Sequence, residues 1–431
     1  MKLFQQMLVA GASLSLIAPI TAQASDIVNL EEISSYARSQ KKSSRLDSKT
    51  FINDVNDVAN LESNENSFEV VQNQFEAGGF SDTTTMDGKA VFWIGAVDGG
   101  DNIGGHEKVE TGYVYSMNLN TSFTGDDNLY VRIKTGDVGG DGDSQWDLKE
   151  TYHIETKDNN DDLKVDKIWY TFPIGENITA TFGPRIENYY MYITPSVYKP
   201  GALKSMKLGG NSNFGASTDV GMGLKYESDG GFGIATNVVS KSADSSGGFL
   251  SKTDKNKWDT QIAYTTDQWH ISATLSNQQN WESHSYNATA EAAAMNSGDF
   301  TGYALRGYWT PEDTGTAIPE ISLGYDIRTA DDGVAAGEPK DSDSYFVGLT
   351  WKDIFQADDR IGVAFTQPLK VTECNGTCTT AEVDPFIWEA YYAFKPNDSI
   401  EVRPAVFGGS NVENSTEDDI FGTVLTTTFK F

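Results

Sequence analysis

Few residues in this sequence are spaced for catalysis. The four histidines are scattered, at His106, His153, His270 and His284. The sequence contains no Gly-x-Ser-x-Gly motif, no His-Glu-x-x-His motif and no phosphate-binding Lys-Ser/Thr loop. A Ser/His site around His270 and Ser272 is the only catalytic alternative that we consider. We therefore expect no enzyme activity and no cofactor.

Two cysteines are candidates for a disulfide or a metal site. Cys374 and Cys378 lie together in the segment Glu-Cys-Asn-Gly-Thr-Cys. In an oxidising compartment this spacing predicts a local disulfide. A metal site would need further ligands, and no histidine or second cysteine pair lies nearby in the sequence. We expect a disulfide and no metal.

One segment combines basic and aromatic side chains in a way that suits small polar solutes. It is locally basic although the whole protein has a formal net charge of -30. Basic groups attract anions and polarise sugar hydroxyls. Its candidate binding residues are Arg185, Tyr189, Tyr190, Lys199, Lys204 and Lys207. The alternative, of equal weight, is that these are surface-loop residues that contact neighbouring loops or lipid headgroups.

The segments of the chain that hold these residues in place are predicted to be strands. From about Met86 onward, apolar and polar residues alternate with a period of two. In the clearest hairpin, residues 113–119 and 129–133 present one apolar face and join through a turn at 124–128. Repetition of this unit predicts about sixteen strands, an even number that suits a closed bacterial barrel. The expected fold is all-β, a transmembrane antiparallel β-barrel.

The spacing between strands supports a membrane barrel. Short turns alternate with long polar stretches along nearly the whole barrel region, as between periplasmic turns and extracellular loops. Aromatic residues gather at strand ends, where rings at a membrane interface prefer to lie. The chain stops within an alternating strand, at Phe431, and a terminal aromatic resembles the signal by which outer-membrane proteins meet their assembly machinery. We expect an outer-membrane location.

The N-terminal residues predict export. Lys2 precedes a mostly apolar stretch, and Ala22-Gln23-Ala24 is a small-x-small cleavage site. We assign 1–24 to a signal peptide, 25–85 to a polar, partly disordered periplasmic extension, and 86–431 to the barrel. The strongly acidic composition argues against nucleic acid as a partner.

A barrel of this size has an interior that side chains cannot fill, which leaves an aqueous channel. Charged residues on the polar faces of the strands would then face this lumen and set a transverse field across it. Pairing between neighbouring strands is their more frequent role. The lumen-facing charges that we expect are Arg132, Lys134, Lys225, Asp259, Arg306, Asp326, Glu389 and Arg403.

The sequence resembles the carbohydrate-selective porin superfamily, and in particular its cyanobacterial branch of iron-uptake or S-layer-homology porins. The residues that carry the resemblance are the segments 1–6, 167–173, 182–185 and 426–431. Larger members of that branch carry an S-layer homology domain and a coiled coil before the barrel. The stretch 25–85 is too short for both, so we expect this chain to lack that domain.

The resemblance implies a porin for passive diffusion of small hydrophilic solutes such as ions, sugars and possibly inorganic iron. The basic segment after the fifth strand would line its constriction. Expected partners are outer-membrane lipid, the barrel assembly machinery and two further copies in a homotrimer. The alternative is a secreted or surface β-protein that acts as an adhesin or structural outer-membrane protein without a transport role.

Overall fold

The computed structural model describes the barrel strands and part of the loops between them. The described residues are 83–99, 108–137, 153–210, 213, 219–241, 248–281, 289, 292, 299–331, 334–378, 384–411 and 419–431. The chain divides into two units, 1–76 and 77–431. The expected signal peptide and nearly all of the expected N-terminal extension lie outside the described residues.

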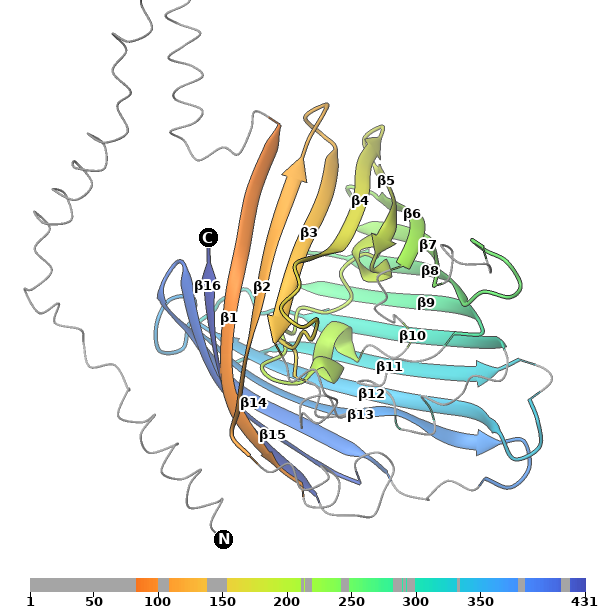
Figure 1. Cartoon of the computed structure of the whole chain (residues 1–431). Coiled ribbons are helices and arrows are strands. Elements are labelled where there is room, and N and C mark those ends of the chain that lie inside the picture. The colour runs from red at the N-terminus through yellow and green to blue at the C-terminus, as the bar shows by residue number, and fades with distance from the viewer. Residues whose placement is uncertain are drawn as a thin grey trace, which may run out of the picture. The chain divides into compact units, whose positions relative to one another are not determined.

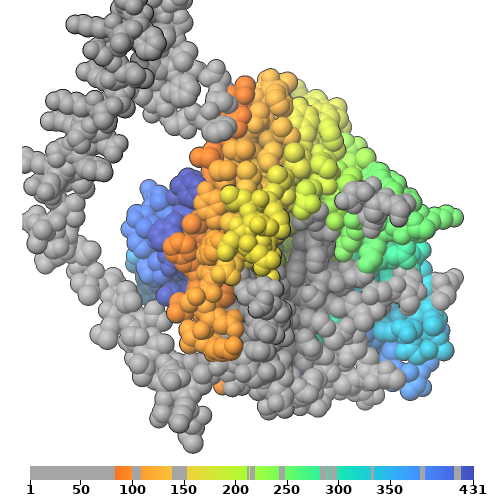
Figure 2. All heavy atoms as spheres, in the orientation of Figure 1, coloured from red at the N-terminus to blue at the C-terminus, as the bar shows by residue number. Residues whose placement is uncertain are grey.

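Sixteen antiparallel strands close into a barrel in which each strand pairs with its sequence neighbours and β1 pairs with β16 (Figure 1). The fold prediction is confirmed. The strands are β1 (Thr84–Asp98), β2 (Glu110–Thr121), β3 (Asn128–Asp137), β4 (Lys164–Ile174), β5 (Ile178–Ile186), β6 (Asp219–Glu227), β7 (Phe232–Ser240), β8 (Asn256–Thr265), β9 (Trp269–Gln279), β10 (Asp299–Trp309), β11 (Glu320–Ala330), β12 (Pro339–Lys352), β13 (Arg360–Cys374), β14 (Phe386–Asn397), β15 (Ile400–Ser410) and β16 (Ile420–Lys430). Figure 2 shows the orange and yellow atoms of the first strands packed side by side into one wall.

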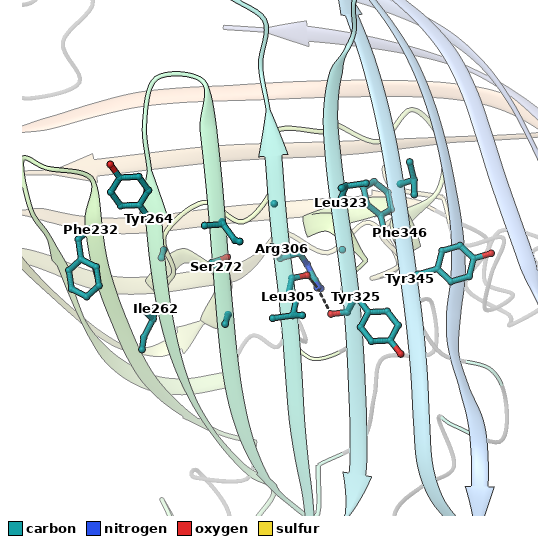
Figure 3. Close-up of a pocket in the computed structure, with 16 residues that line it drawn as sticks. Phe232, Ile262, Tyr264, Ser272, Leu305, Arg306, Leu323, Tyr325, Tyr345 and Phe346 are labelled. Carbon is teal, nitrogen blue, oxygen red and sulfur yellow. Dashed lines mark hydrogen bonds between the residues drawn. The ribbon is translucent and has the colours of Figure 1, made fainter.

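The alternation in sequence becomes an apolar outside and a polar inside. On β9, Trp269 and Ile271 are exposed on the outer face, whereas His270, Ser272 and Thr274 are buried on the inner face. Figure 3 shows further outward side chains on the strands β7 to β12, among them Ile262 and Leu305. Such an apolar outer belt suits the hydrocarbon of a bilayer. The pairing of neighbouring strands meets a second requirement, because it satisfies backbone groups that have no water to bind in lipid. Among the described residues, no helix is long and apolar enough to span a membrane.

Turns at one end of the barrel are held by aspartates. In the turn between β2 and β3, Asp127 accepts hydrogen bonds from the Phe123 and Thr124 N–H groups, both at 2.8 Å. The Tyr170 hydroxyl on β4 also donates to this carboxylate, at 2.6 Å. These bonds satisfy turn amides that have no partner in the sheet, so they fix the hairpin against the next strand.

The last residue closes the seam between the first and last strands. The Gly88 N–H donates to the Phe431 carbonyl at 2.8 Å, and the Phe431 ring stacks on Tyr115 with centroids 5.9 Å apart. A Cβ at Gly88 would lie 2.6 Å from the Phe431 ring, so only glycine leaves room for it. The role of Phe431 as an assembly signal stays a prediction.

The inner face is less uniformly polar than its alternation predicts. Apolar side chains point inward along β1 and β12 to β16, and they pack with the loop that follows β5. The members of this cluster that lie on the strands are Trp93, Val97, Phe346, Ala364, Ile387, Tyr391, Ala393, Ala405, Phe407 and Val424. They gain from burial because a loop, rather than water, covers them.

We predict that Leu305→Lys destabilises the barrel in lipid vesicles. Leu305 is 54% exposed on the outer face, and a lysine facing lipid costs about 2–4 kcal/mol near the bilayer midplane. Urea-dependent unfolding in phospholipid vesicles measures the change. Leu305→Val, which keeps the position apolar, is the control. Equal unfolding midpoints for the two variants would show that this face does not contact hydrocarbon.

Candidate pore constriction

The loop between β5 and β6, called L3 below, folds into the barrel. Its described residues, 187–210 and 213, include the short 3-10 helices η4 (Asn188–Met191) and η5 (Lys204–Gly209). The yellow-green coil of this region lies inside the ring of strands in Figure 1. Leu203 and Met206 are completely buried in the apolar cluster of the wall. L3 therefore narrows the lumen.

Glu389 on β14 holds the middle of L3. Its side chain is buried, and one carboxylate oxygen accepts hydrogen bonds from the Gly201 N–H and the Tyr198 hydroxyl, both at 2.8 Å. The other oxygen accepts from the Ala202 and Leu203 N–H groups at 2.9 and 2.7 Å. Four accepted hydrogen bonds fill the lone-pair sites of a carboxylate. Glu389 is thus an anchor of the loop.

A second anchor on β8 holds the start of L3. The buried carboxylate of Asp259 accepts hydrogen bonds from the Tyr192 hydroxyl and from Asn188 Nδ2, the latter at 3.1 Å. Gln261, two residues further along, accepts from the Ile193 N–H at 2.9 Å and donates to the Ile193 carbonyl at 3.2 Å. Both partners lie on the inner face of one strand, as the period of two requires.

A third anchor on β10 and β11 holds the end of L3. The buried Arg306 guanidinium donates to the Leu208 carbonyl at 2.9 Å and to the Gly210 carbonyl. It also pairs with Asp326 at 2.8 Å. Asp326 in turn accepts from the Asn213 N–H at 3.2 Å. Four of the charges expected to face the lumen, Asp259, Arg306, Asp326 and Glu389, therefore bind L3.

The exposed edge of L3 carries cations and tyrosine rings toward β4. Lys207 Nζ lies 4.1 Å from the centroid of the Tyr189 ring, in a cation–π contact. Tyr189 stacks on Tyr190 with centroids 4.6 Å apart. Lys167 on β4 forms an ion pair with Glu187 and donates to the Tyr189 hydroxyl at 3.2 Å. Loop and wall are thus joined by charge and by aromatic contact.

Positive charges outnumber negative ones where L3 faces β3 and β4. Burial, together with the positive charges of Lys134 and Lys207, lowers the pKa of Lys204 to about 7. Burial also lowers the pKa of Lys207 to about 8, although Glu187 opposes the shift. The charged groups that act on one another here, six positive and three negative, are called the eyelet cluster below: Arg132, Lys134, Glu155, Lys157, Asp166, Lys167, Glu187, Lys204 and Lys207.

Two candidates from the basic segment lie outside the eyelet cluster. Lys199 is exposed, and its charge interacts with Arg360 and Glu401 near the ends of β13 and β15. Arg185 is exposed beside a β-bulge of β5, and its Nε donates to the Asp166 carbonyl at 3.4 Å. The structure brings together Tyr189, Tyr190, Lys204 and Lys207 from that set.

Two remaining lumenal candidates pair locally. Lys225 forms an ion pair with Glu227 at 2.7 Å, near the end of β6. Arg403 lies 3.7 Å from Glu401, and it also lies 3.9 Å from Glu155 of the loop between β3 and β4. The Lys225–Glu227 and Arg403–Glu401 pairs each lie along one strand, two residues apart and on the same face.

Sequence reasoning missed Lys167, Trp169 and Glu187 as site residues. Trp169 packs between Tyr130 on β3 and Tyr190 on L3, in tilted contacts with centroids 4.4 and 4.7 Å away. The sequence did contain a signal for the first two residues: alternation along β4 places Lys167 and Trp169 on the same face of the strand. Glu187 had no such signal, because its role depends on where L3 folds.

His270 and Ser272, the catalytic alternative from the sequence, lie close together, but the second ring nitrogen of His270 contacts a hydroxyl and not a carboxylate. His270 Nε2 lies 2.9 Å from the Ser272 hydroxyl, while Nδ1 contacts the Thr265 hydroxyl at 2.8 Å. A hydrolase triad needs a carboxylate on that second nitrogen to orient the ring. His270 also stacks on Tyr308, 4.8 Å away. His270 is therefore a hydrogen-bonded residue of the barrel wall.

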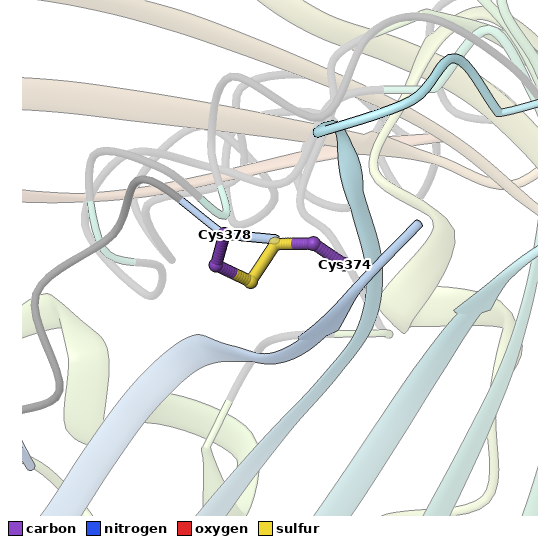
Figure 4. Close-up of a disulfide and its surroundings, with 2 residues drawn as sticks. All are labelled: Cys374 and Cys378. Carbon is purple, nitrogen blue, oxygen red and sulfur yellow. A yellow bond between two sulfur atoms is a disulfide. The ribbon is translucent and has the colours of Figure 1, made fainter. Parts of the chain in front are cut away.

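The two cysteines form a disulfide at the end of β13 (Figure 4). Within their loop, the Asn375 backbone carbonyl accepts a hydrogen bond from the Gly337 N–H at 2.6 Å. The Asn375 N–H donates to the Glu338 backbone carbonyl at 2.9 Å. The disulfide thus closes a loop that is tied to the segment before β12. Among the residues that the structure describes, no group of three His, Cys, Asp or Glu residues could hold a metal ion.

We predict that Glu389→Gln loosens L3 without opening the barrel. Whichever way the amide turns, its NH₂ group would face at least one backbone N–H from which it cannot accept, so hydrogen bonds of residues 201–203 are lost. Hydrogen exchange of the amides at residues 201–203 should accelerate by roughly ten- to a hundredfold. Glu373→Gln, which changes an exposed carboxylate near the end of β13, is the control. Unchanged exchange at 201–203 would mean that apolar packing alone fixes the loop.

Comparison with known proteins identifies the family to which the chain belongs. The family model described as "Carbohydrate-selective porin, OprB family" matches residues 56–431. An uncharacterized protein of Nostoc sp. is 24% identical over 468 residues, which cover 96% of this chain and 75% of the relative. The match to the family begins within the stretch that we assigned to the N-terminal extension.

Solved porin structures share the fold. OprB of Pseudomonas putida superposes with a TM-score of 0.57 at 12% identity and covers 85% of this chain and 97% of its own. OmpT of Vibrio cholerae in its trimer form has a TM-score of 0.51 at 13% identity and covers 81% of this chain and 100% of its own. At these identities the likeness shows the fold alone.

The family match covers most of the chain, and the closed barrel has the polar inside and apolar outside that an outer-membrane channel needs. The resemblance seen in the sequence and the expected location are confirmed. The protein is an outer-membrane porin for passive solute diffusion, a channel rather than an enzyme. The chain belongs to the carbohydrate-selective porin, OprB family.

Proposed function

We propose that this porin favours anions and small sugars over cations, and that the eyelet cluster makes the selection. The observation that carries the proposal is the excess of cations where L3 faces β3 and β4. In a narrow aqueous passage with low-dielectric walls, charged side chains act strongly on a passing ion. The positive excess lowers the energy of an anion there and raises that of a cation.

Aromatic rings beside the cluster extend the proposal to sugars. Tyr130, Trp169, Tyr190 and Tyr189 follow one another with centroid distances of 4.4, 4.7 and 4.6 Å. The apolar face of a sugar packs on such rings, while nearby charged groups bind its hydroxyls. Inorganic iron as a free cation fits this constriction poorly, because the same positive excess repels it.

The assembly and the export of the protein complete the proposal. A homotrimer is supported by the fold that the chain shares with OmpT, whose structure is of a trimer form. The outer apolar belt binds membrane lipid, and the barrel assembly machinery inserts the chain through its C-terminal strand. Residues 1–24 act as the signal peptide, and 25–85 as a periplasmic extension.

We predict that Lys204→Glu with Lys207→Glu reverses the ion preference. The two changes turn the positive excess of the eyelet cluster negative, while both side chains remain partly exposed and leave the anchors of L3 in place. Reversal potentials in a potassium chloride gradient across a planar bilayer give the ratio of anion to cation permeability. Lys395→Glu, near the end of β14 where Lys395 pairs with Asp358 of the turn before β13, serves as the control. An unchanged ratio would remove the eyelet cluster from the proposal.

We predict that anion preference falls as the pH rises from about 6 to about 9. A lysine is positive below its pKa, and the pKa values of Lys204 and Lys207 are lowered to about 7 and about 8. Both charges are therefore present at the low end of this window and lost at its high end. The measurement is the reversal potential at each pH. Lys204→Met with Lys207→Met should give a clearly shallower profile, and a flat profile in the wild type would contradict the assignment.

A further inference from the structure

Cations gather at a second place in the chain, where short turns join the strands. Lys352 is the last residue of β12 and Arg360 is the first residue of β13. The two lie directly opposite each other in the register of these strands. Lys430 is the last residue of β16. Short turns mark the periplasmic end of an outer-membrane barrel, so these three cations lie at its periplasmic mouth.

Alternation along the strands places these three side chains on the inner face. Lys352 follows the buried Thr350 by two residues, and Lys430 follows the buried Thr428 by two. Residues two apart on a strand share a face. Arg360 shares the face of Lys352 because the two residues are direct partners across the strands. All three cations therefore border the lumen.

Two of the three cations are partly offset by carboxylates. Lys352 forms an ion pair with Glu320 on β11 at 2.5 Å, and Arg360 forms one with Glu401 on β15 at 3.2 Å. Like charges directly opposite each other destabilise a pair of strands, so these carboxylates make the Lys352–Arg360 pairing tolerable. The carboxylates lie on the far sides of the two cations, on strands that flank β12 and β13 but do not separate them.

L3 adds a fourth cation to this place. The Lys199 carbonyl accepts a hydrogen bond from the Tyr391 hydroxyl on β14 at 2.6 Å. A Cβ at Gly201 of L3 would lie 2.2 Å from the Tyr391 ring, and a Cβ at Gly362 of β13 would lie 2.1 Å from it. The ring therefore fills the space between L3 and β13, and it fixes the backbone that carries Lys199.

The Lys199 side chain is exposed, and positive groups surround it. Burial of part of the chain, together with the charges of Arg360 and Lys352, lowers the pKa of Lys199. Lys430 acts in the same direction, and Glu401 opposes it. Lys430 is exposed as well. Within the part of the chain that the structure describes, neither Lys199 nor Lys430 has a carboxylate within ion-pair distance.

We propose that Lys199, Lys352, Arg360 and Lys430 form a binding site for small oxyanions, such as inorganic phosphate, at the periplasmic mouth. Lys199 and Lys430 supply ammonium donors that no carboxylate occupies, and Lys352 with Arg360 keeps the wall between them positive. An oxyanion can accept hydrogen bonds from several such donors at once. The site lies on β12, β13 and β16, whereas the eyelet cluster faces β3 and β4. It deepens the proposed preference for anions and rests on that function.

The test measures how phosphate protects single lysines from an amine-acylating reagent. The porin in detergent is labelled briefly at increasing concentrations of inorganic phosphate and at constant ionic strength, and mass spectrometry gives the label at each lysine. We expect Lys199 and Lys430 to be protected over the same range of phosphate concentration. Lys225, which lies near the end of β6 and pairs with Glu227, should stay unprotected.

Lys199→Gln separates a shared site from independent lysines. It removes one exposed cation and keeps the backbone carbonyl that Tyr391 binds, so the fold is retained. The phosphate concentration that half protects Lys430 should rise by roughly fivefold, because one charge is lost from the site. Lys225→Gln is the matched control and should leave that concentration unchanged. Lys204→Met with Lys207→Met should also leave it unchanged, because these residues belong to the eyelet cluster.

Two results would overturn the site. One is equal protection of Lys225 and Lys430 in the wild type, which would show general screening by phosphate. The other is an unchanged half-protecting concentration at Lys430 in Lys199→Gln. A wild type without anion preference in reversal potentials would contradict the proposed function instead. The protection of Lys430 is measured without a membrane potential and would still decide whether the site binds phosphate.

Discussion

A loop inside a barrel brings backbone amides and carbonyls into a place where they need partners, and the barrel wall must supply them. Glu389 does this for the middle of L3 by accepting hydrogen bonds from three successive N–H groups and from the Tyr198 hydroxyl. An unpaired polar group in such a buried place costs free energy comparable to a lost hydrogen bond. The path of L3, and with it the shape of the constriction, depends on this requirement.

The anchors divide the lumen into sides with different properties. Along β12 to β16 and β1 the wall is apolar where L3 covers it. On β8, β10 and β11, buried charged and amide side chains bind both ends of the described part of L3. Toward β3 and β4 the loop presents Lys204 and Lys207. In the function that we propose, selectivity is therefore a property of one side of the passage, and the other sides hold the loop there.

The loop between β3 and β4 also contacts L3 inside the barrel. It pairs with L3 through Ile154 and reaches Lys89 and Arg403 through Glu155. Two loops that come from adjacent parts of the chain thus act as one insert in the barrel. The acidic composition of the whole protein does not predict the charge inside, because the positive excess is confined to a few groups that the loops bring together.

The fold class, the number of strands and the face on which most side chains lie could be predicted from the sequence alone. These features follow from a local pattern, since a period of two places each residue on one side of a strand whatever the rest of the chain does. The sequence also singled out the basic segment that contains Lys204 and Lys207. The anchoring of L3 by Glu389, Asp259 and Arg306 follows from the folding of the whole chain. The same holds for the interior positions of Lys167, Glu187 and Glu155. Tyr198 and Glu389 are 191 residues apart, and a contact over such a distance is set by the closure of the barrel and not by any local pattern.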